Sequence, residues 1–476
     1  MAEIRDQKLP HALVIPNPFQ GHINPTIHLA LKLASKGFII TFVNTQFIHS
    51  QITKAQLTSS EPNNDDIFSK ARESGLDIRY LTISDGFPLD FDRSINSLQF
   101  WEGFANNFSG NVDELVGKSV KDNCVDPINC FVADTFFSWP SIIAKKYGIV
   151  HVSFFSEPAL VFALYYHMDL LKQNGHIGSD ENRKDPVDYI PGVKSIEASD
   201  LPFLVQNPMV DQSIYNAFQD VRKADIIIAN TIEELELETV TTIQENLNFY
   251  SIGPIVSANF TELTIPSSLW SEIDCTQWLD TKPRGSVLYI SFGSIAIVNK
   301  EDILELAHGL MLSEVNFIWI LKLSQDEKSI LPLEYEEKVK DRGLIVPWCN
   351  QMRVISHSAI RGFLSHCGWN SVVESIWCGV PLICYPLVTD QLANRKLVVY
   401  DWKVGINLRD GESIKREEVH DKIKYLMNRE TSSNLRKNIA QVKETFHNAL
   451  AMNGSSNVNF NKLVEELKMR MKISLA

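Results

Sequence analysis

Basic residues are in the minority in this chain of 476 residues, which has 45 Lys and Arg against 58 Asp and Glu and a net charge of −13. Proteins that bind the phosphate backbone of nucleic acids select for basic surfaces, so this balance argues against a nucleic-acid partner. Cysteine is also scarce, with seven residues and no CxxC pair, which suits a reducing compartment. The chain exceeds the roughly 250–300 residues at which one hydrophobic core stops growing, and two domains are the natural division.

Long apolar runs are missing as well. No stretch of 18 or more apolar residues occurs, so we expect no membrane-spanning helix and no membrane partner. The N-terminal segment has only a short apolar run before Gly21, which is too brief for the core of a signal peptide. We therefore expect a cytoplasmic protein, and we expect it to act as a monomer.

Four familiar motifs are absent, namely GxGxxG, GxxxxGK[ST], HExxH and GxSxG. The most common dinucleotide, triphosphate, zinc-peptidase and serine-hydrolase interpretations therefore have no support. A zinc site at Cys349, His357, His366 and Cys367 is also disfavoured, because adjacent side chains in an extended chain point to opposite sides. We expect no metal ion.

Strand-like and helix-like segments alternate along the chain in two series. The first series begins with an apolar run at His11–Pro16, a polar loop, a helical stretch and a second run at Phe38–Val43. Further strands are expected at Ile128–Val132 and Ile226–Ala229. Each strand lies near a helical segment, which predicts a parallel sheet covered on both faces.

The second series follows a segment rich in Pro, Ser and Thr that has no periodicity and is typical of a linker. We predict an N-terminal domain over 1–254, this linker over 255–271, a C-terminal domain over 272–455, and a final helix at 456–476 that packs back on the first domain. The strands expected in the second domain are Ser286–Ser291, Phe317–Leu321, Leu344–Val346, Gly362–Ser365 and Pro381–Tyr385.

The densest group of unusual residues lies between Trp348 and Gln391. Within it, the loop His366–Asn370 follows a predicted strand and leads into a helix that we expect to begin at Ser371. The N–H groups and the positive dipole end of a helix start suit an anion such as phosphate. Gly368 has no side chain, so a diphosphate could approach the backbone there.

Other residues of this stretch suit the remaining parts of a nucleotide sugar. Trp348 offers a flat face for stacking a base. Glu374 can accept hydrogen bonds from two ribose hydroxyls, and Asp390 and Gln391 can bind sugar hydroxyls. Structural alternatives exist for several positions, because Ser371 and Glu374 also form an S-x-x-E capping box and a tryptophan is often a core residue.

The stretch 348–391 is similar at nearly every defining position to the donor-binding signature of the plant secondary product glycosyltransferases, which use UDP-sugars. The motifs W-x2-Q, H-x-G-W-N-S, a Glu after two more residues, G-V-P and a final D-Q are all present. The similarity covers essentially the whole chain through four further motifs. These are F-x-G-H-x-x-P at Phe19–Pro25, A-D-x-F at Ala133–Phe136, N-T-x-x-E-L-E at Asn230–Glu236 and S-V-x-Y-x-S-F-G-S at Ser286–Ser294.

This resemblance to plant family 1 UDP-dependent glycosyltransferases implies an α/β protein of the GT-B fold, with two facing Rossmann-like domains, parallel sheets and a cleft between them. It implies a hexosyltransferase of the inverting, metal-independent kind. UDP-glucose would be a co-substrate, so no cofactor is expected. The partners would be a UDP-sugar donor and a small aromatic or apolar acceptor.

The resemblance also implies roles for individual positions. Trp348 would stack on uracil, and Gln351 and Glu374 would bind the ribose. The residues implied for the diphosphate are His366, Gly368, Asn370, Ser371, Gly293 and Ser294. The residues implied for the sugar are Trp369, Asp390, Gln391 and, near its 6-hydroxyl, Ser156.

His22 matches the catalytic base of the family and Asp134 matches its partner. An alcohol acceptor must lose a proton as it attacks the anomeric carbon, and a neutral imidazole can take that proton near pH 7. His22 lies near the expected start of a helix, where the positive dipole end disfavours imidazolium. Taken alone, His22 could instead bond to the backbone and Asp134 could cap a turn.

Our leading hypothesis is transfer of glucose to a hydroxyl of a small plant metabolite. A flavonoid or another phenolic is favoured, because the segments Phe87–Trp101 and Phe154–Met168 are rich in Phe, Tyr and Leu and suit an aromatic acceptor. One alternative is a C-glycosyltransferase that acts on an aromatic carbon of such an acceptor. Another is a non-catalytic protein that binds nucleotide sugars.

Overall fold

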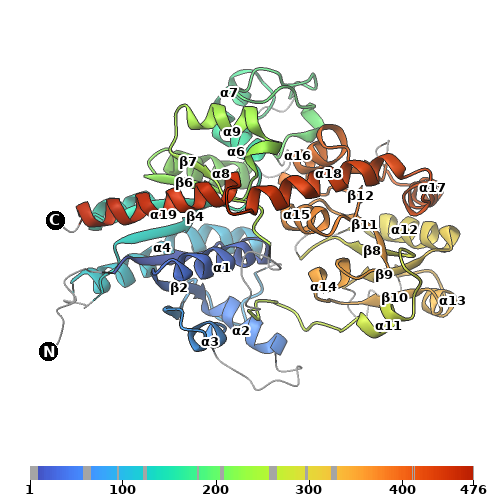
Figure 1. Cartoon of the computed structure of the whole chain (residues 1–476), viewed down its shortest axis with the longest axis horizontal. Helices are drawn as coiled ribbons and strands as arrows, with labels where there is room; N and C mark the ends of the chain where they lie inside the picture. The colour runs from blue at the N-terminus through green and yellow to red at the C-terminus, as the bar shows by residue number, and fades with distance from the viewer. Residues whose placement is uncertain are drawn as a thin grey trace. The chain divides into compact units, whose positions relative to one another are not determined.

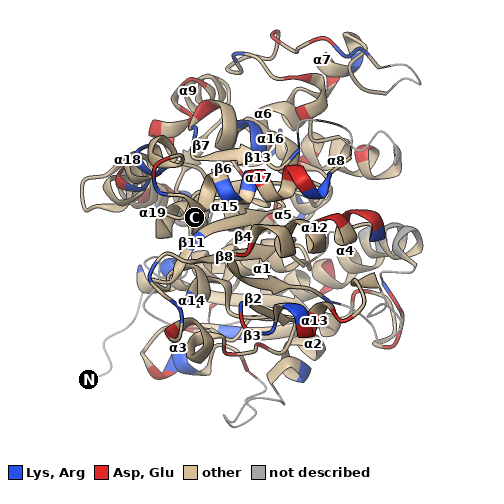
Figure 2. Ribbon diagram, turned by 90° about the vertical axis from the view of Figure 1, so that its right-hand side faces the viewer, with Lys and Arg blue, Asp and Glu red and all other residues tan. Residues whose placement is uncertain are grey.

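A computed structural model describes residues 9–56, 66–93, 96–121, 126–178, 182–203, 208–256, 265–294, 298–322, 330–409, 411 and 413–474. The chain divides into two compact units (Figure 1). We call them the N-terminal unit, which comprises Met1–Met168, Asn207–Trp270 and Leu450–Ala476, and the C-terminal unit, which comprises Asp169–Gln206 and Ser271–Ala449. Asp and Glu are spread over the helices of both units, as expected from the net charge (Figure 2).

The N-terminal unit contains a seven-stranded sheet in the order β3-β2-β1-β4-β5-β6-β7. All of its strand pairs are parallel. The strands are β1 (His11–Ile15), β2 (Ile39–Thr45), β3 (Ile78–Ile83), β4 (Cys130–Asp134), β5 (Val150–Phe155), β6 (Ile226–Ala229) and β7 (Phe249–Ser251).

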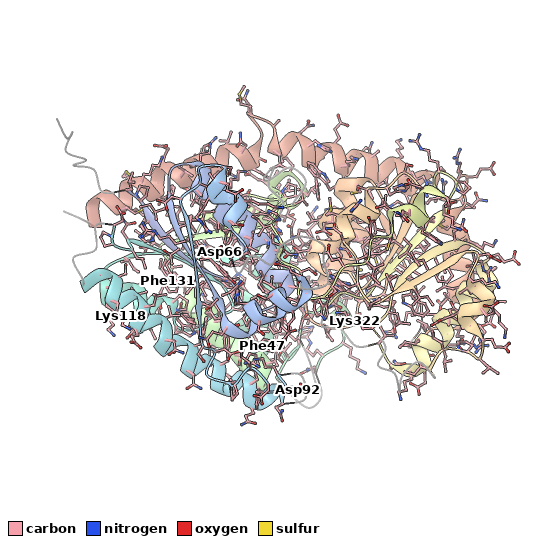
Figure 3. The ribbon with its side chains drawn as sticks, turned by 90° about the horizontal axis from the view of Figure 1, so that it is seen from below. Phe47, Asp66, Asp92, Lys118, Phe131 and Lys322 are labelled. Carbon is pink, nitrogen blue, oxygen red and sulfur yellow. The ribbon has the colours of Figure 1, made fainter. Side chains whose placement is uncertain are left out.

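Alternation along β1 shows why this sheet is covered on both faces. Ala12 and Val14 belong to one core cluster, whereas Leu13 and Ile15 belong to another. Because successive side chains of a strand point to opposite faces, a run of apolar residues supplies two cores at once. Phe131 on β4 is fully buried in the second cluster, whereas Lys118 lies on the exposed side of the helix α4 (Ser97–Lys121) (Figure 3).

Helices cover this sheet. They are α1 (Gln20–Ser35), α2 (Gln46–Gln56), α3 (Ser69–Glu73), α4 (Ser97–Lys121), α5 (Pro140–Tyr147), α6 (Ala159–Tyr166), α8 (Pro208–Val221), α9 (Leu237–Gln244) and α19 (Ser455–Ser474). The helix α7 (Met168–Gln173) begins where the first part of this unit ends. The last helix, α19, packs on β5 and β7, and its Phe460, Leu463 and Leu467 are part of the first core cluster.

The C-terminal unit contains a six-stranded sheet in the order β10-β9-β8-β11-β12-β13, again with parallel pairs. The strands are β8 (Val287–Ser291), β9 (Asn316–Ile320), β10 (Gly343–Val346), β11 (Ile360–Ser365), β12 (Leu382–Cys384) and β13 (Gly405–Asn407). The helices are α11 (Thr276–Asp280), α12 (Lys300–Ser313), α13 (Tyr335–Val339), α14 (Gln351–Ile355), α15 (Trp369–Cys378), α16 (Asp390–Lys396), α17 (Arg416–Met427) and α18 (Ser433–Leu450).

The two parallel, helix-covered sheets confirm the prediction of two Rossmann-like domains. All nine strands expected from apolar runs are present, with bounds that differ by up to two residues. Four further strands, β3, β5, β7 and β13, were not predicted from the sequence.

One segment N-terminal to the predicted domain boundary at residue 254 belongs to the other unit. The described part of Asp169–Gln206 groups with the C-terminal unit. Arg395 on α16 forms an ion pair with Asp200, which lies in the 3-10 helix η1 (Ala198–Asp200). Because Asp200 is buried, this pair holds the segment to α16. Residues 257–264 of the expected linker lie outside the described residues.

Candidate active site

His22 and Asp134 lie in direct contact in the N-terminal unit. The Nδ1 atom of His22 is 2.8 Å from Oδ2 of Asp134, and their side chains are 18% and 1% exposed. His22 lies in the first turn of α1, which follows β1, and Asp134 is the last residue of the neighbouring strand β4. The parallel pairing of β1 and β4 therefore brings the two side chains together at one edge of the sheet.

This hydrogen bond determines the chemistry that the imidazole can perform. When Nδ1 donates to the carboxylate, the lone pair of a neutral ring lies on Nε2, which becomes the basic nitrogen. The second oxygen of Asp134 accepts from the backbone N–H of Phe136 at 3.0 Å, which fixes the carboxylate. Asp134 therefore caps this turn, as the structural alternative from the sequence suggested, and it also bonds to His22.

Ser156 lies beside the base. It follows β5, its side chain is buried, and its hydroxyl oxygen is 3.3 Å from Nδ1 of His22. The sequence placed Ser156 near the 6-hydroxyl of the sugar, but in the structure its described contact is with the imidazole. Two half-buried rings also flank His22, with Phe136 edge-on at 5.5 Å and Phe19 at 6.3 Å between centroids.

The aromatic segments that suggested an acceptor pocket are largely used for packing. Phe154, Phe155 and Phe162 are at most 1% exposed. Phe155 and Phe162 each pack against Phe218, at 6.0 and 5.3 Å between ring centroids. In the other segment, Phe100 stacks on Phe104, and both rings belong to the second core cluster. The side chain of Trp101 lies outside the described residues.

In the C-terminal unit, Gln351, Ser371 and Glu374 form one hydrogen-bonded group. The amide nitrogen of Gln351 donates to the Ser371 hydroxyl at 3.0 Å and to the Glu374 carboxylate at 2.7 Å. The hydroxyl of Tyr289, on β8, donates to the Gln351 amide oxygen at 3.3 Å. Burial raises the pKa of Glu374 to about 7, although the bond from Gln351 acts in the opposite direction. Tyr289 was not predicted as part of this group, although it is the Tyr of the S-V-x-Y-x-S motif, which could have identified it.

The helix α15 begins at Trp369, two residues before the start expected from the sequence. Its N-cap is Gly368, which makes no side-chain cap hydrogen bond, and the preceding Cys367 has a left-handed φ of +66°. Ser371 is therefore the third residue of the helix and accepts from Gln351, so the capping-box alternative is wrong. The first turn of α15, which includes Asn370, carries the positive end of the helix dipole.

His366 fills the space that the sequence assigned to a diphosphate at Gly368. A Cβ atom built on either Gly293 or Gly368 would lie 2.5 Å from Nε2 of His366, so both glycines make room for the imidazole. Gly293 has a φ of +77° in the turn after β8, and Ser294 follows it. Burial lowers the pKa of His366 to about 4, against the effect of a backbone hydrogen bond with Ser291. The ring is thus neutral near pH 7 and can donate one hydrogen bond.

Trp348 follows β10 and is half-buried. The ammonium group of Lys322 lies 4.3 Å from the centroid of its ring, so a cation covers part of the indole. Lys322 follows β9 in the C-terminal unit (Figure 3). The described contact of Trp348 is therefore a cation–π contact, which is compatible with stacking on the other face of the ring.

The three residues assigned to the sugar differ in their surroundings. The indole of Trp369 is 6% exposed and packs 6.0 Å from the ring of Trp402, which does not fit a side-chain contact with a ligand. Asp390 begins α16 and accepts from the amide of Asn394 at 2.7 Å. The Gln391 amide oxygen accepts from two backbone N–H groups of the preceding loop, at 2.9 and 3.1 Å.

Within each unit, the candidate residues gather at one edge of the sheet. In the N-terminal unit they follow the carboxyl ends of β1, β4 and β5, and in the C-terminal unit those of β8, β10, β11 and β12. This is the edge at which open α/β sheets bind ligands. Asn394, which the sequence analysis missed, donates to the carbonyl of Cys367 at 3.0 Å and links two of these loops.

No group of three or more His, Cys, Asp or Glu side chains in the described part of the chain could hold a metal ion. None of the helices in that part is both long and apolar enough to span a membrane.

Comparison with known proteins identifies the family. A family model for UDP-glucoronosyl and UDP-glucosyl transferases matches residues 271–452. UDP-glycosyltransferase 86A1 of Arabidopsis thaliana is 50% identical to this chain, over 98% of this chain and 96% of its own length. The chain belongs to the plant UDP-glycosyltransferase family. It is therefore an enzyme that uses a UDP-sugar, and the hypothesis of a non-catalytic binding protein is set aside.

Solved structures of UDP-glycosyltransferases share the GT-B fold with this chain. Medicago truncatula UGT71G1 complexed with UDP-glucose has a TM-score of 0.81 and 24% identity, with coverage of 97% of this chain and 99% of that one. A UDP-glucose:anthocyanidin 3-O-glucosyltransferase in complex with UDP has a TM-score of 0.80 and 26% identity, with the same coverage.

Proposed function

We propose that this UDP-glycosyltransferase transfers glucose from UDP-glucose to a hydroxyl group of a small plant metabolite, with inversion at the anomeric carbon and without a metal ion. The observation that carries the proposal is the 2.8 Å hydrogen bond between His22 and Asp134. It joins a ring nitrogen and a buried carboxylate at the sheet edge where such folds bind ligands. A general base of this kind contributes about 10²–10⁴-fold to the rate.

The chemical step follows from this arrangement. Nε2 of His22 accepts the proton of the acceptor hydroxyl while the acceptor oxygen forms a bond to the anomeric carbon. The bond from that carbon to the diphosphate oxygen breaks, and UDP leaves with the electron pair. The carboxylate of Asp134 stabilises the imidazolium through Nδ1. Attack on the face opposite to UDP converts an α-linked donor to a β-glycoside.

The donor would be held by residues of the C-terminal unit. Glu374 and Gln351 would exchange part of their mutual hydrogen bonding for the ribose hydroxyls. The first-turn N–H groups of α15 would donate to the diphosphate as its negative charge grows. His366 would join them by turning its single N–H from the Ser291 carbonyl to the diphosphate. Trp348 would stack on uracil.

The sugar would contact Asp390 and Gln391. Asp390 would accept from hydroxyl groups through its carboxylate. The amide oxygen of Gln391 is used by the loop before α16, so its NH2 group would face the sugar. The choice of UDP-glucose is supported by the 26% identical relative, whose name includes that donor.

For the acceptor we propose a flat, largely apolar compound with a hydroxyl group, such as a flavonoid or another phenolic. Support comes from the half-buried rings of Phe19 and Phe136 beside the base, which suit stacking or edge contacts with an aromatic acceptor. The relative whose name includes an anthocyanidin is consistent with this class of acceptor.

A direct test incubates the purified enzyme with UDP-glucose and a panel of flavonoids, simple phenols and aliphatic alcohols, with and without a chelator. We expect mass spectrometry to detect a glucoside of at least one phenolic at an equal rate in both conditions. Proton NMR should show a β-linkage, and acid should release the glucose. An acid-resistant product would instead identify transfer to carbon, and an α-linked or chelator-sensitive product would contradict the mechanism.

A further inference from the structure

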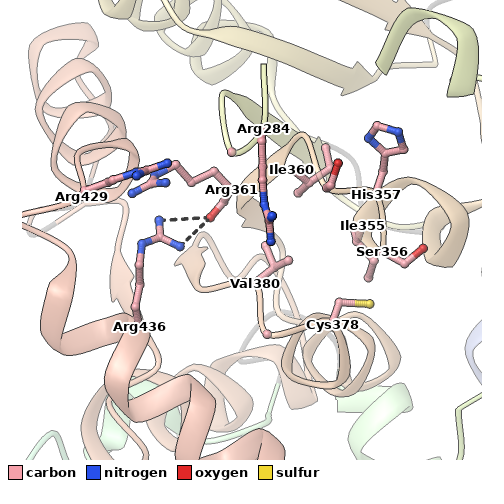
Figure 4. A pocket seen from close by; sticks show the side chains of 13 residues that line it. Arg284, Ile355, Ser356, His357, Ile360, Arg361, Cys378, Val380, Arg429 and Arg436 are labelled. Atoms are coloured by element: carbon pink, nitrogen blue, oxygen red, sulfur yellow. Dashed lines mark hydrogen bonds between the residues drawn. The ribbon is translucent and has the colours of Figure 1, made fainter. Parts of the chain in front are cut away.

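A cavity of 270 Å³ lies in the C-terminal unit, at the amino ends of its strands. Four arginines line it: Arg284 from the turn before β8, Arg361 from β11, Arg429 from the segment after α17, and Arg436 from α18 (Figure 4). The candidate donor residues all follow the carboxyl ends of strands in this unit. The arginine cavity therefore lies at the opposite edge of the sheet from the candidate donor residues.

The positive charges of this cavity lack compensating carboxylates. Among the described residues, no Asp or Glu lines the cavity, and none of the four arginines forms an ion pair. Burial and the neighbouring Arg429 lower the pKa of Arg361. Burial, Arg361 and Arg429 together lower the pKa of Arg436 to about 10. The lowered pKa values agree with the geometry, in which the arginine side chains line one cavity (Figure 4).

The backbone is shaped to place Arg361 in this cavity. The pairing of β11 with β8 shifts register between Ile360 and Gly362, so Arg361 occupies a bulge, a feature that re-aims a side chain. Gly285 has a φ of +64°, and a Cβ atom there would lie 3.1 Å from Nη1 of Arg361. The turn before β8 therefore leaves room for the guanidinium group.

Arg361 is buried, and two of its side-chain nitrogens have no hydrogen-bond partner among the described residues. The residue is 8% exposed, and its Nε and Nη2 atoms have no hydrogen-bond partner among the described residues. Its carbonyl accepts from both terminal nitrogens of Arg436, at 3.4 and 3.3 Å, which orders the second arginine (Figure 4). A buried, unpaired charge costs stability, and an anion that accepts these donors would remove that cost.

We propose that this cavity binds the phosphate group of a small anion, either inorganic phosphate or a small phosphate ester. The guanidinium fork of Arg361 matches the geometry of phosphate oxygens, and Arg284 and Arg429 can add donors from other elements. Arg436 contributes mainly its charge, because its nitrogens already donate to Ser432, Leu426 and the Arg361 carbonyl. The cavity is larger than phosphate needs, which leaves space for a short substituent. Its only ring-bearing lining residue among those described is His357, whose imidazole is engaged with Asp280 at 3.1 Å, so an aromatic base is not favoured.

Thermal unfolding of the intact enzyme tests this site. We expect sodium phosphate to raise the melting temperature above the value in sodium chloride of equal ionic strength. Arg361→Gln should abolish most of this rise. Arg353→Gln is a matched control, because Arg353 is exposed and paired with Asp274 outside the cavity, and it should keep the rise. A rise of equal size in wild type and Arg361→Gln would overturn the proposal, because the phosphate would then bind elsewhere.

Two further measurements keep the test decisive if Arg361→Gln folds poorly. Arg284 and Arg429 are exposed, so the double variant Arg284→Gln/Arg429→Gln should fold, and calorimetry should show at least tenfold weaker phosphate binding. Unchanged affinity would contradict the site. Comparison with glycerol 3-phosphate identifies the ligand source, because tighter binding of the ester assigns the cavity to a phosphorylated metabolite and tighter binding of phosphate assigns it to the free anion.

Discussion

The hydrogen bond from Nδ1 of His22 to Asp134 decides which nitrogen of the imidazole can accept a proton. Ser156 approaches the same Nδ1 atom at 3.3 Å from a third strand end. Because the Nδ1 hydrogen is donated to Asp134, the serine hydroxyl oxygen can only accept a second, weaker share of that hydrogen, which favours the same orientation of the ring. We therefore expect Ser156 to position His22, a role that its match to a sugar-binding position did not indicate.

We predict that Ser156→Ala lowers kcat by a similar factor with UDP-glucose and with UDP-xylose, which lacks the 6-hydroxyl. A residue that acts through His22 affects every donor alike, and its loss should also change the pH profile of kcat. Steady-state kinetics with the two donors provide the measurement. A loss confined to UDP-glucose would restore the sugar-contact role and refute the positioning role.

Glu374 should make the stability of the enzyme depend on pH. Burial raises its pKa to about 7 in the folded chain, above the usual value of 4.5, so the folded state holds the proton more tightly than the unfolded state does. Its contribution to stability is therefore fully present below about pH 4.5 and is lost as the pH rises through 7. We predict that Glu374→Gln melts at a higher temperature than wild type at pH 8, and that this advantage shrinks toward pH 5. An advantage that does not change with pH would contradict the assignment.

The sequence predicted the identity of candidate side chains better than their orientation. The signature named Gly368, Trp369 and Gln391, but the structure fills the space at Gly368 with the His366 ring, buries the indole of Trp369 and ties the Gln391 oxygen to a loop. A motif records which residue occurs at a position, whereas burial and neighbouring donors decide whether its side chain or its backbone faces a ligand. Those neighbours come from distant parts of the chain.

Strands were predictable where apolar runs are long and bounded by turn residues. β5 was missed because His151 and Ser153 interrupt its apolar pattern, although both are buried in the sheet. β13 is three residues long, which is too short for a periodicity to emerge. The start of α15 was misplaced because Ser371 and Glu374 resemble a capping box, whereas the helix begins after the left-handed Cys367.

The entry into α15 should tolerate no side chain at Gly368. A Cβ atom there would lie 2.5 Å from Nε2 of His366 and would displace the ring. We predict that Gly368→Ala weakens the binding of UDP-glucose at least tenfold by calorimetry. Gly110→Ala in α4 is the control, because no heavy atom lies within 4 Å of a Cβ built there, and it should leave the affinity unchanged. Equal affinities for wild type and Gly368→Ala would show that the ring position does not matter for the donor.

The two sheets of the chain have the same plan, with candidate chemistry at the carboxyl ends of parallel strands. The last helix, α19, joins the core of the N-terminal unit although it comes after the whole C-terminal unit in sequence. The hydrogen bonds of Glu466 to Asn248 and Tyr250 add polar contacts between α19 and the segment that contains β7. The stability of the N-terminal unit should therefore depend on the end of the chain.

We predict that Leu467→Ala destabilises the N-terminal unit by about 2–5 kcal/mol, because Leu467 is 1% exposed in its core. Hydrogen exchange should become faster in β5 and β7 and stay unchanged in β8 and β11. Met469→Ala on the same helix is the control, since Met469 is 58% exposed and its loss should be nearly neutral. Uniformly faster exchange in both units would contradict this unit-specific role.

The most direct test of the proposed mechanism compares turnover with donor binding in His22→Ala, Asp134→Asn and wild type. Both variants should bind UDP-glucose with unchanged affinity and lose about 10²–10⁴-fold in kcat, because they remove the base or its partner and leave the donor residues intact. His49→Ala, which removes a histidine bonded to Tyr80, should retain wild-type kcat. Wild-type turnover in His22→Ala would rule out His22 as the general base.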